Sequence, residues 1–132
     1  MANNIRWQQR LFNLERAFID FESASTRSSY TKLERSGLIQ TFEFTFELAW
    51  KTLQDLLISR GYEGAVGPRP VIEQAFQDRV IIDGENWLKM LISRNLTTHS
   101  YNEKTAQEIA ANIKDIYYPL IRELIITLRQ EQ

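Results

Sequence analysis

Hydrophobic residues near the N-terminus recur every three or four positions, a spacing that places side chains on one face of an α-helix. This first stripe consists of Trp7, Leu11, Leu14, Phe18 and Phe21. The polar run over residues 23–29 interrupts it with serine and threonine, whose side chains compete for backbone hydrogen bonds and favour turns. The pattern therefore predicts a first helix followed by a connection.

The longest helical pattern extends from about Tyr30 to Arg60 and carries two apolar strips. One comprises Leu38, Phe42, Phe46, Ala49, Leu53 and Leu56, and the other comprises Phe44, Leu48 and Leu57. Because one neighbour cannot cover this much hydrophobic surface, we expect the helix to be central or partly buried at a subunit interface. Gly61 lies where a left-handed C-terminal cap is expected, and Gly37 is a candidate break near the start.

The middle of the chain predicts a loop and two shorter helices. Residues 61–70 hold three of the five glycines and two of the three prolines, and the loop ends on a proline suited to a first helical turn. A short helix is expected over residues 71–77. After a turn at Asp83-Gly84, a fourth helix is predicted that fades at Thr97-Thr98. Its apolar residues are Trp87, Leu88, Leu91, Ile92 and Leu96.

Asn102 is suited to cap a last helix. The apolar face of this helix comprises Ala106, Ile109, Ile113, Ile116, Leu120, Leu124 and Leu128. Pro119 lies inside the pattern, which resumes unchanged after it, so we expect a bend and not an end. No segment alternates with the two-residue period of a strand. The sequence predicts one all-α domain over residues 1–132, an antiparallel up-and-down four-helix bundle with a short extra helix.

The composition is that of an ordinary globular protein, with 43% hydrophobic and 25% charged residues. The 16 basic and 17 acidic side chains nearly cancel, so no global positive field favours DNA, and any contact with RNA must be local. The absence of cysteine excludes disulfides, thiolate zinc sites and cysteine nucleophiles. The chain has no secretory signal pattern and no apolar run near the ~20 residues that span a bilayer, so we expect a cytoplasmic protein without a membrane partner.

The one histidine, His99, follows Arg94 by five positions. On an uninterrupted helix the two side chains would point about 140° apart. Thr97 and Thr98 are poor helix-interior residues, so the helix is expected to end between Arg94 and His99 and let the histidine fold back towards the arginine. A guanidinium beside an imidazole suits phosphodiester cleavage, but a lone histidine is more often structural, so spacing alone is a weak signal.

Other charged residues are candidates for binding. Glu43 and Glu47 lie four apart on one helical face, as paired acids or metal ligands might, but Lys51 follows four residues later and favours an ion-paired face. We therefore predict neither a metal nor another cofactor. A local phosphate-binding rim could include Arg69, Lys89 and Lys104, although exposed charges are usually only solvated.

The segment Arg94-Asn95-x-x-x-His99-x-Tyr101, where x is any residue, resembles the motif of HEPN domains. The tyrosine resembles that of HEPN toxins paired with minimal nucleotidyltransferases. Nearly all of the chain is similar to the nucleotidyltransferase substrate-binding protein family. The similar segments are residues 37–40, 42–51, 68–69, 83–87 and 94–103.

The resemblance implies a homodimer whose two motifs meet in a cleft and cleave RNA without a metal. His99 would then be the general base, Arg94 would stabilise charge on the phosphate oxygens, and Asn95 would orient them. The products would carry a 2′,3′-cyclic phosphate and a 5′-hydroxyl. The cognate minimal nucleotidyltransferase would act as antitoxin by transferring AMP from ATP onto Tyr101, which adds negative charge and blocks the cleft.

Two other functions stay open. In the first, the chain is a non-catalytic substrate-binding subunit of a two-component nucleotidyltransferase, and the motif is an inherited ligand pocket. In the second, it is a structural dimerisation bundle without chemistry. The presence of both motif residues together with the tyrosine favours the ribonuclease toxin.

Overall fold

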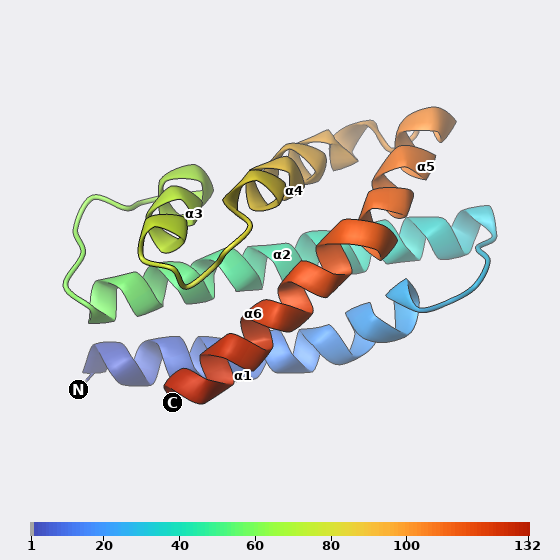
Figure 1. Cartoon of the computed structure of the whole chain (residues 1–132). Coiled ribbons are helices and arrows are strands. Elements are labelled where there is room, and N and C mark those ends of the chain that lie inside the picture. Colours follow the sequence, from blue (N-terminus) through green and yellow to red (C-terminus); the bar gives the residue numbers. More distant parts are fainter. Residues whose placement is uncertain (1) are drawn as a thin grey trace.

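Helices account for most of the chain in the computed structural model, which describes residues 2–132 and side chains from residue 5 onward (Figure 1). The elements are α1 (Ala2–Ser25), α2 (Lys32–Ser59), α3 (Pro68–Gln77), α4 (Gly84–Leu96), a 3-10 turn (Thr97–His99), α5 (Glu103–Asn112), a π-helical turn (Ile113–Tyr117) and α6 (Tyr118–Glu131). Residues 2–132 contain no strand, which confirms the all-α prediction. Within the same residues, no helix is long and apolar enough to cross a membrane.

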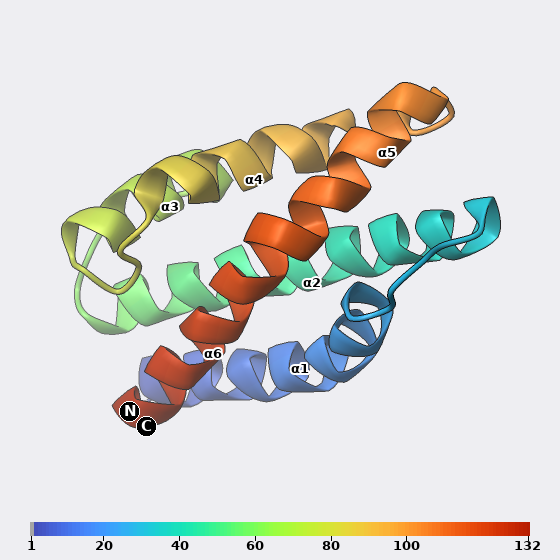
Figure 2. The same cartoon turned by 45° about the vertical axis from the view of Figure 1, so that its right-hand side comes forward.

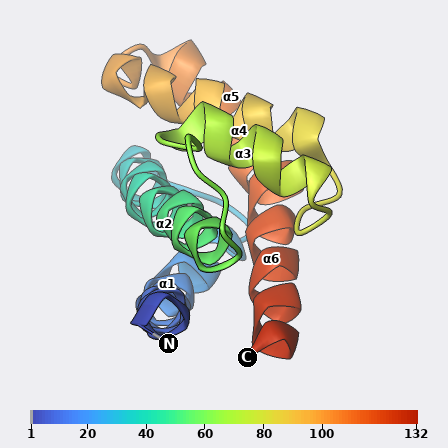
Figure 3. The same cartoon turned by 90° about the vertical axis from the view of Figure 1, so that its left-hand side faces the viewer.

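The second helix, α2, lies at the centre of the bundle. It runs antiparallel to α1 along most of its length and also contacts α3, α4 and α5 (Figures 1 and 2). Seen along the bundle, α1, α2 and α4 are stacked while α6 stands beside them and packs on α1 (Figure 3). This confirms the four-helix bundle, in which α5 and α6 together form the fourth long element, and it confirms the central place predicted for α2.

Both ends of α2 are fixed by local hydrogen bonds. At its start, the Thr31 side chain accepts from the Glu34 backbone N–H while the Glu34 side chain accepts from the Thr31 N–H, a capping box. At its end, Gly61 has φ 90° and donates to Ile58 O, which confirms the predicted left-handed cap. The break suggested at Gly37 is wrong, because α2 is continuous through it.

Two boundaries differ from the sequence prediction. The third helix starts at Pro68 instead of residue 71, because Pro68 lacks an N–H and needs no partner at the first helical position. Asp83 does not form a free turn but caps α4, accepting from the Asn86 N–H at 3.2 Å. Gly84 then packs so closely on α3 that a Cβ at this position would lie 2.8 Å from the Phe76 ring.

The π-helical turn before Pro119 changes which face of the last helix is buried. Proline cannot donate to the carbonyl four residues earlier, and its ring would crowd that carbonyl. The wider turn over Ile113–Tyr117 precedes the proline and shifts the apolar register by one residue. Tyr117 and Ile121 are therefore fully buried, whereas Ile116 and Leu120 are only half-buried. The prediction that the pattern resumes unchanged is therefore wrong for Ile116 and Leu120, whereas the predicted core positions Leu124 and Leu128 are buried.

Two polar contacts involve buried side chains of the bundle. The Asp55 carboxylate on α2, of which 4% is exposed, accepts from Arg10 Nε at 2.7 Å. The Ser93 hydroxyl on α4 lies 2.6 Å from the Tyr117 hydroxyl, which also donates to the Lys89 carbonyl. Burial raises the pKa of Tyr117, so the phenol stays neutral and able to donate.

Candidate functional site

The motif segment lies where α4 ends and the chain turns into α5. The backbone N–H and the hydroxyl of Thr97 both donate to the Arg94 carbonyl, the hydroxyl at 2.7 Å. Thr97 itself is buried, and residues Thr97–His99 continue as a single 3-10 turn. The predicted end of the α-helix between Arg94 and His99 is therefore confirmed.

The far side of this turn is held by the start of α5. The Asn102 side chain accepts from the Thr105 N–H, which confirms Asn102 as the N-cap. The Asn102 N–H donates to the His99 carbonyl at 3.1 Å. Glu103 accepts from both terminal nitrogens of Arg35 on α2, at 2.8 and 2.9 Å. The turn is thus anchored at both ends while its middle faces solvent.

The side chains of His99 and Tyr101 meet on the exposed part of the turn. Their ring centroids are 6.0 Å apart with an interplanar angle of 64°, an edge-to-face contact. Tyr101 is 83% exposed and His99 is also exposed. A large molecule in solution can therefore reach both rings at once.

Arg94 points to α2 and forms an ion pair there. Its Nη2 lies 2.9 Å from Glu47 Oε1, with 37% of the arginine and 30% of the glutamate side chain exposed. Its Nε is buried and has no acceptor among the described residues. Within the described chain, no hydrogen bond or ring contact joins Arg94 to His99. The structure thus brings His99 to Tyr101 and Arg94 to Glu47, but it does not join the two pairs directly.

Glu47 also lies beside Lys51, its predicted partner. Its second oxygen is 3.9 Å from Lys51 Nζ, which confirms the ion-paired face. Sequence reasoning missed the contact to Arg94, since it depends on how α4 is rotated on α2. No cluster of three or more acidic or histidine side chains in the described part of the chain could hold a metal ion.

The remaining candidate residues are exposed but scattered. Asn95 lies next to Arg94 on the solvent side of α4, and Lys104 lies in the first turn of α5. Lys89 is exposed near the middle of α4. Arg69 lies at the start of α3, a helix that contacts α4. Their binding of RNA stays a prediction.

An uncovered apolar stripe runs along α4 towards the motif. Ile92 is 52% exposed and Leu96 is 42% exposed, one helical turn apart, and Leu88 is half-buried one turn earlier. Adjacent large hydrophobic side chains that face water mark surfaces suited to a partner. The stripe places that surface directly beside Asn95.

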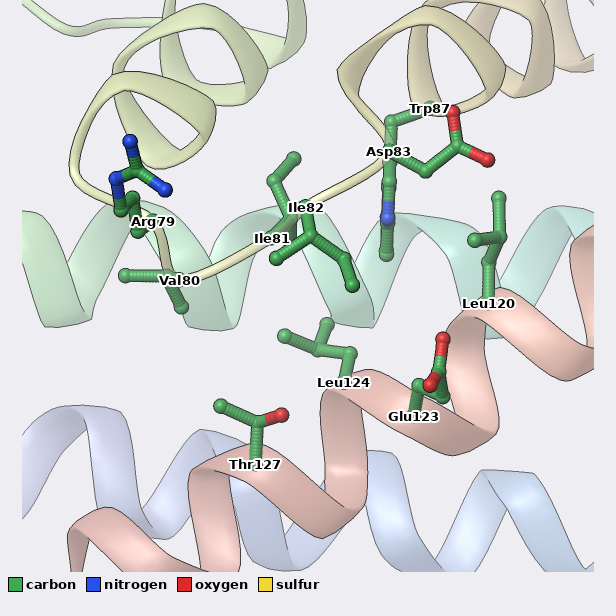
Figure 4. Close-up of a pocket in the computed structure, with 10 residues that line it drawn as sticks. All are labelled: Arg79, Val80, Ile81, Ile82, Asp83, Trp87, Leu120, Glu123, Leu124 and Thr127. Carbon is green, nitrogen blue, oxygen red and sulfur yellow. The ribbon is translucent and has the colours of Figure 1, made fainter.

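A small cavity of about 100 Å³ lies away from the motif, where the α3–α4 connection faces α6 (Figure 4). Apolar side chains, among them Ile82 and Leu124, line it together with the carboxylates of Asp83 and Glu123. These two carboxylates outnumber the one cation in the lining, Arg79, which disfavours a phosphate ligand. The motif turn therefore remains the better candidate for RNA chemistry.

Comparison with known proteins assigns the family. The family model described as nucleotidyltransferase substrate binding protein like matches residues 9–130. The chain belongs to this family. A Haemophilus influenzae protein named probable ribonuclease HepT is 33% identical over 84 residues, which are 61% of this chain and 58% of that protein. The chain thus matches little more than half the length of this relative.

Two solved structures of similar proteins share the fold of this chain. A crystal structure of a Thermus thermophilus protein has a TM-score of 0.82 at 33% identity, and covers 88% of this chain and 98% of that one. Haemophilus influenzae HI0074, whose structure is said to reveal the fold of a substrate binding domain of a nucleotidyltransferase, has a TM-score of 0.68 at 26% identity. That match covers 97% of this chain and 99% of HI0074.

Proposed function

We propose that this chain is a metal-independent endoribonuclease toxin that is silenced by AMPylation of Tyr101. One observation carries the proposal: the exposed rings of His99 and Tyr101 meet at an anchored turn, and the partly exposed Arg94 lies in the last turn of α4 just before it. The similarity to a protein named probable ribonuclease HepT supports it. RNA is the substrate class that an arginine and an imidazole suit together.

The proposed reaction is an internal transfer within RNA. The His99 imidazole takes the proton from a ribose 2′-hydroxyl, and the 2′-oxygen forms a bond to the adjacent phosphorus. The bond from phosphorus to the 5′-oxygen breaks, and the leaving oxygen takes a proton from the imidazolium or from water. Arg94 stabilises the charge that builds on the phosphate oxygens, and Asn95 orients the reacting groups. The products are a 2′,3′-cyclic phosphate and a 5′-hydroxyl.

The active form in this proposal is a homodimer that pairs the Ile92–Leu96 stripe of two copies. Burial of these exposed side chains supplies a hydrophobic driving force, and a two-fold axis beside the stripe brings two motifs near each other. Leu96→Glu is expected to give a monomer that retains its fold and loses cleavage. Ile82→Glu, at a 75% exposed position away from the motif, is the matched control and should stay dimeric.

The proposed inhibitor is a cognate minimal nucleotidyltransferase that acts as antitoxin. The Tyr101 oxygen attacks the α-phosphorus of ATP, pyrophosphate leaves, and AMP remains on the phenol. The added phosphate charge competes with RNA for the nearby cations, and the nucleoside fills the space over His99. Mass spectrometry of peptides after incubation with nucleotidyltransferase, ATP and magnesium tests this step. Modification at any other residue rejects it.

Cleavage is tested with purified wild-type and Arg94→Ala protein mixed with total cellular RNA in the presence of a metal chelator. We expect fragments with cyclic phosphate and 5′-hydroxyl ends from the wild type only. In cells, expression of the chain alone should slow growth and His99→Ala should relieve the slowing. Equal growth with both versions, together with intact RNA in the test tube, would reject the toxin.

A second candidate is a non-catalytic substrate-binding subunit of a two-component nucleotidyltransferase. It is favoured by the description of HI0074 and by the lack of a direct contact between Arg94 and His99 among the described residues. This candidate predicts that the chain leaves RNA intact and instead increases the activity of the nucleotidyltransferase that it binds.

A further inference from the structure

The Glu47 carboxylate contacts two cations, Arg94 on α4 and Lys51 on its own helix, α2. Its Oε1 lies 2.9 Å from Nη2 of Arg94 on α4, and its Oε2 lies 3.9 Å from Lys51, one turn further along α2. A carboxylate whose two oxygens face two different cations keeps both cations close to one point. The bridge therefore joins the motif turn to the central helix.

The contact to Glu47 orients Arg94 without using all of its donors. A guanidinium has five N–H groups in a fixed plane. Nη2 pairs with the Glu47 carboxylate at 2.9 Å, and the buried Nε has no acceptor among the described residues. The remaining hydrogens belong to terminal nitrogens of a side chain that is 37% exposed. An oriented guanidinium with free N–H groups is suited to a phosphate.

Lys51 is held loosely at the same place. Its ammonium is 3.9 Å from Glu47 and 5.9 Å from the centre of the Trp50 ring, and 42% of the side chain is exposed. A long ion pair on a helix surface is weak, so an incoming phosphate can take the place of the carboxylate. The cation–π contact limits how far the ammonium can move.

We propose that Arg94 and Lys51 form a two-cation binding site for the phosphate backbone of single-stranded RNA, and that Glu47 is the positioning residue that holds them. The two cations and one carboxylate carry a formal charge of +1, although the whole chain carries −1. This gives the local attraction that RNA needs on a chain without a global positive field. The inference rests on the proposed function in that RNA is the ligand.

Binding is tested separately from cleavage with a 2′-O-methyl oligonucleotide, which lacks the attacking hydroxyl. Lys51→Met should raise the Kd severalfold and flatten the plot of log affinity against log salt by about 0.7, the slope of one phosphate contact on a single strand. Lys51→Arg keeps the charge and should keep the slope. Lys32→Met is the control, because Lys32 is exposed on the same helix about 28 Å away. An unchanged slope in Lys51→Met overturns the site.

The positioning role of Glu47 is tested with Glu47→Gln, which keeps the size of the side chain and removes its charge. Oligonucleotide binding should tighten a few-fold, because an anion that competes with phosphate is gone. Cleavage at saturating RNA should slow about tenfold or more, because Arg94 loses its fixed orientation. Opposite changes in binding and turnover are not expected from general loss of structure. Unchanged turnover in Glu47→Gln rejects the positioning role.

The outcomes separate this site from the proposed function. If the wild type binds the oligonucleotide with these variant effects but cleaves no RNA, the ribonuclease fails and the binding site stands. If it cleaves RNA while Lys51→Met binds like the wild type, the ribonuclease stands and the site fails. Failure of the wild type both to bind and to cleave rejects both. If thermal denaturation shows that Glu47→Gln is unfolded, the Lys51 variants decide the result.

Discussion

The ion pair between Arg10 on α1 and Asp55 on α2 predicts unequal losses of stability when its two partners are removed in turn. Only 4% of the Asp55 side chain is exposed, whereas 37% of the Arg10 side chain is exposed. In Arg10→Met the carboxylate stays buried and loses its cation, which costs about 3–5 kcal/mol. In Asp55→Ala the arginine can turn to water, so the cost is closer to the about 1.5–3 kcal/mol of one charge-assisted hydrogen bond. The more exposed partner should therefore be the more costly one to remove.

Guanidinium chloride unfolding followed by far-UV circular dichroism measures both costs, at one protein concentration so that any dimerisation contributes equally. Arg129→Met is the control, because its partner Glu15 lies in a more exposed pair that should contribute about 1 kcal/mol or less. A larger loss from Asp55→Ala than from Arg10→Met would refute this reasoning.

Three further predictions concern stability. Tyr117→Phe leaves the buried Ser93 hydroxyl without its partner and should cost about 1–2 kcal/mol by chemical denaturation; no measurable loss would mean that the bond contributes nothing. Thr31→Ala removes the capping box of α2 and should cost about 1 kcal/mol in the same assay, while Thr31→Ser should restore it. The hydrogen bond from the Tyr62 hydroxyl lowers the pKa of Asp78 below its usual 3.8, so its contribution is complete above that pH and is lost as pH falls through the lowered value. The wild type and Asp78→Asn should therefore converge in acid, and a constant difference at every pH contradicts the assignment.

The first helix shows what sequence periodicity can predict. Spacings of three and four fix the face of a helix locally, and Trp7, Leu11, Leu14 and Phe21 are all buried as the stripe requires. Phe18, from the same stripe, is half-buried and stacks on Tyr118. The end of α4 was predictable for a similar reason, because Thr97 bonds to the backbone of its own helix.

The last helix shows where periodicity fails. Ile116 and Tyr117 are both apolar enough for the core, so the residue pattern fits either register. The π-helical turn brings Tyr117 into the core, where its hydroxyl lies 2.6 Å from the Ser93 hydroxyl, and Pro119 follows two residues later. Because Ser93 lies 24 residues from Tyr117, the local pattern of hydrophobic residues does not reveal which register is buried.

The sequence pattern does not predict the ion pair between Glu47 and Arg94 either, because this contact joins two different helices. The sequence paired Glu47 with Lys51, one turn along the same helix, and this contact is present at 3.9 Å. The shorter contact comes from a different helix. Its existence requires the relative rotation of α2 and α4, which local propensity does not determine.

Because Gly84 has no side chain, the start of α4 packs directly against the Phe76 ring of α3. Arg94 lies ten residues further along α4, roughly 15 Å away at about 1.5 Å per residue, so a tilt of α4 by about 5° about this contact displaces the arginine by about 1 Å. A displacement of that size can change a rate a hundredfold. Variation at this glycine is therefore a route by which relatives with the same motif could differ in catalytic rate while their motif residues stay identical.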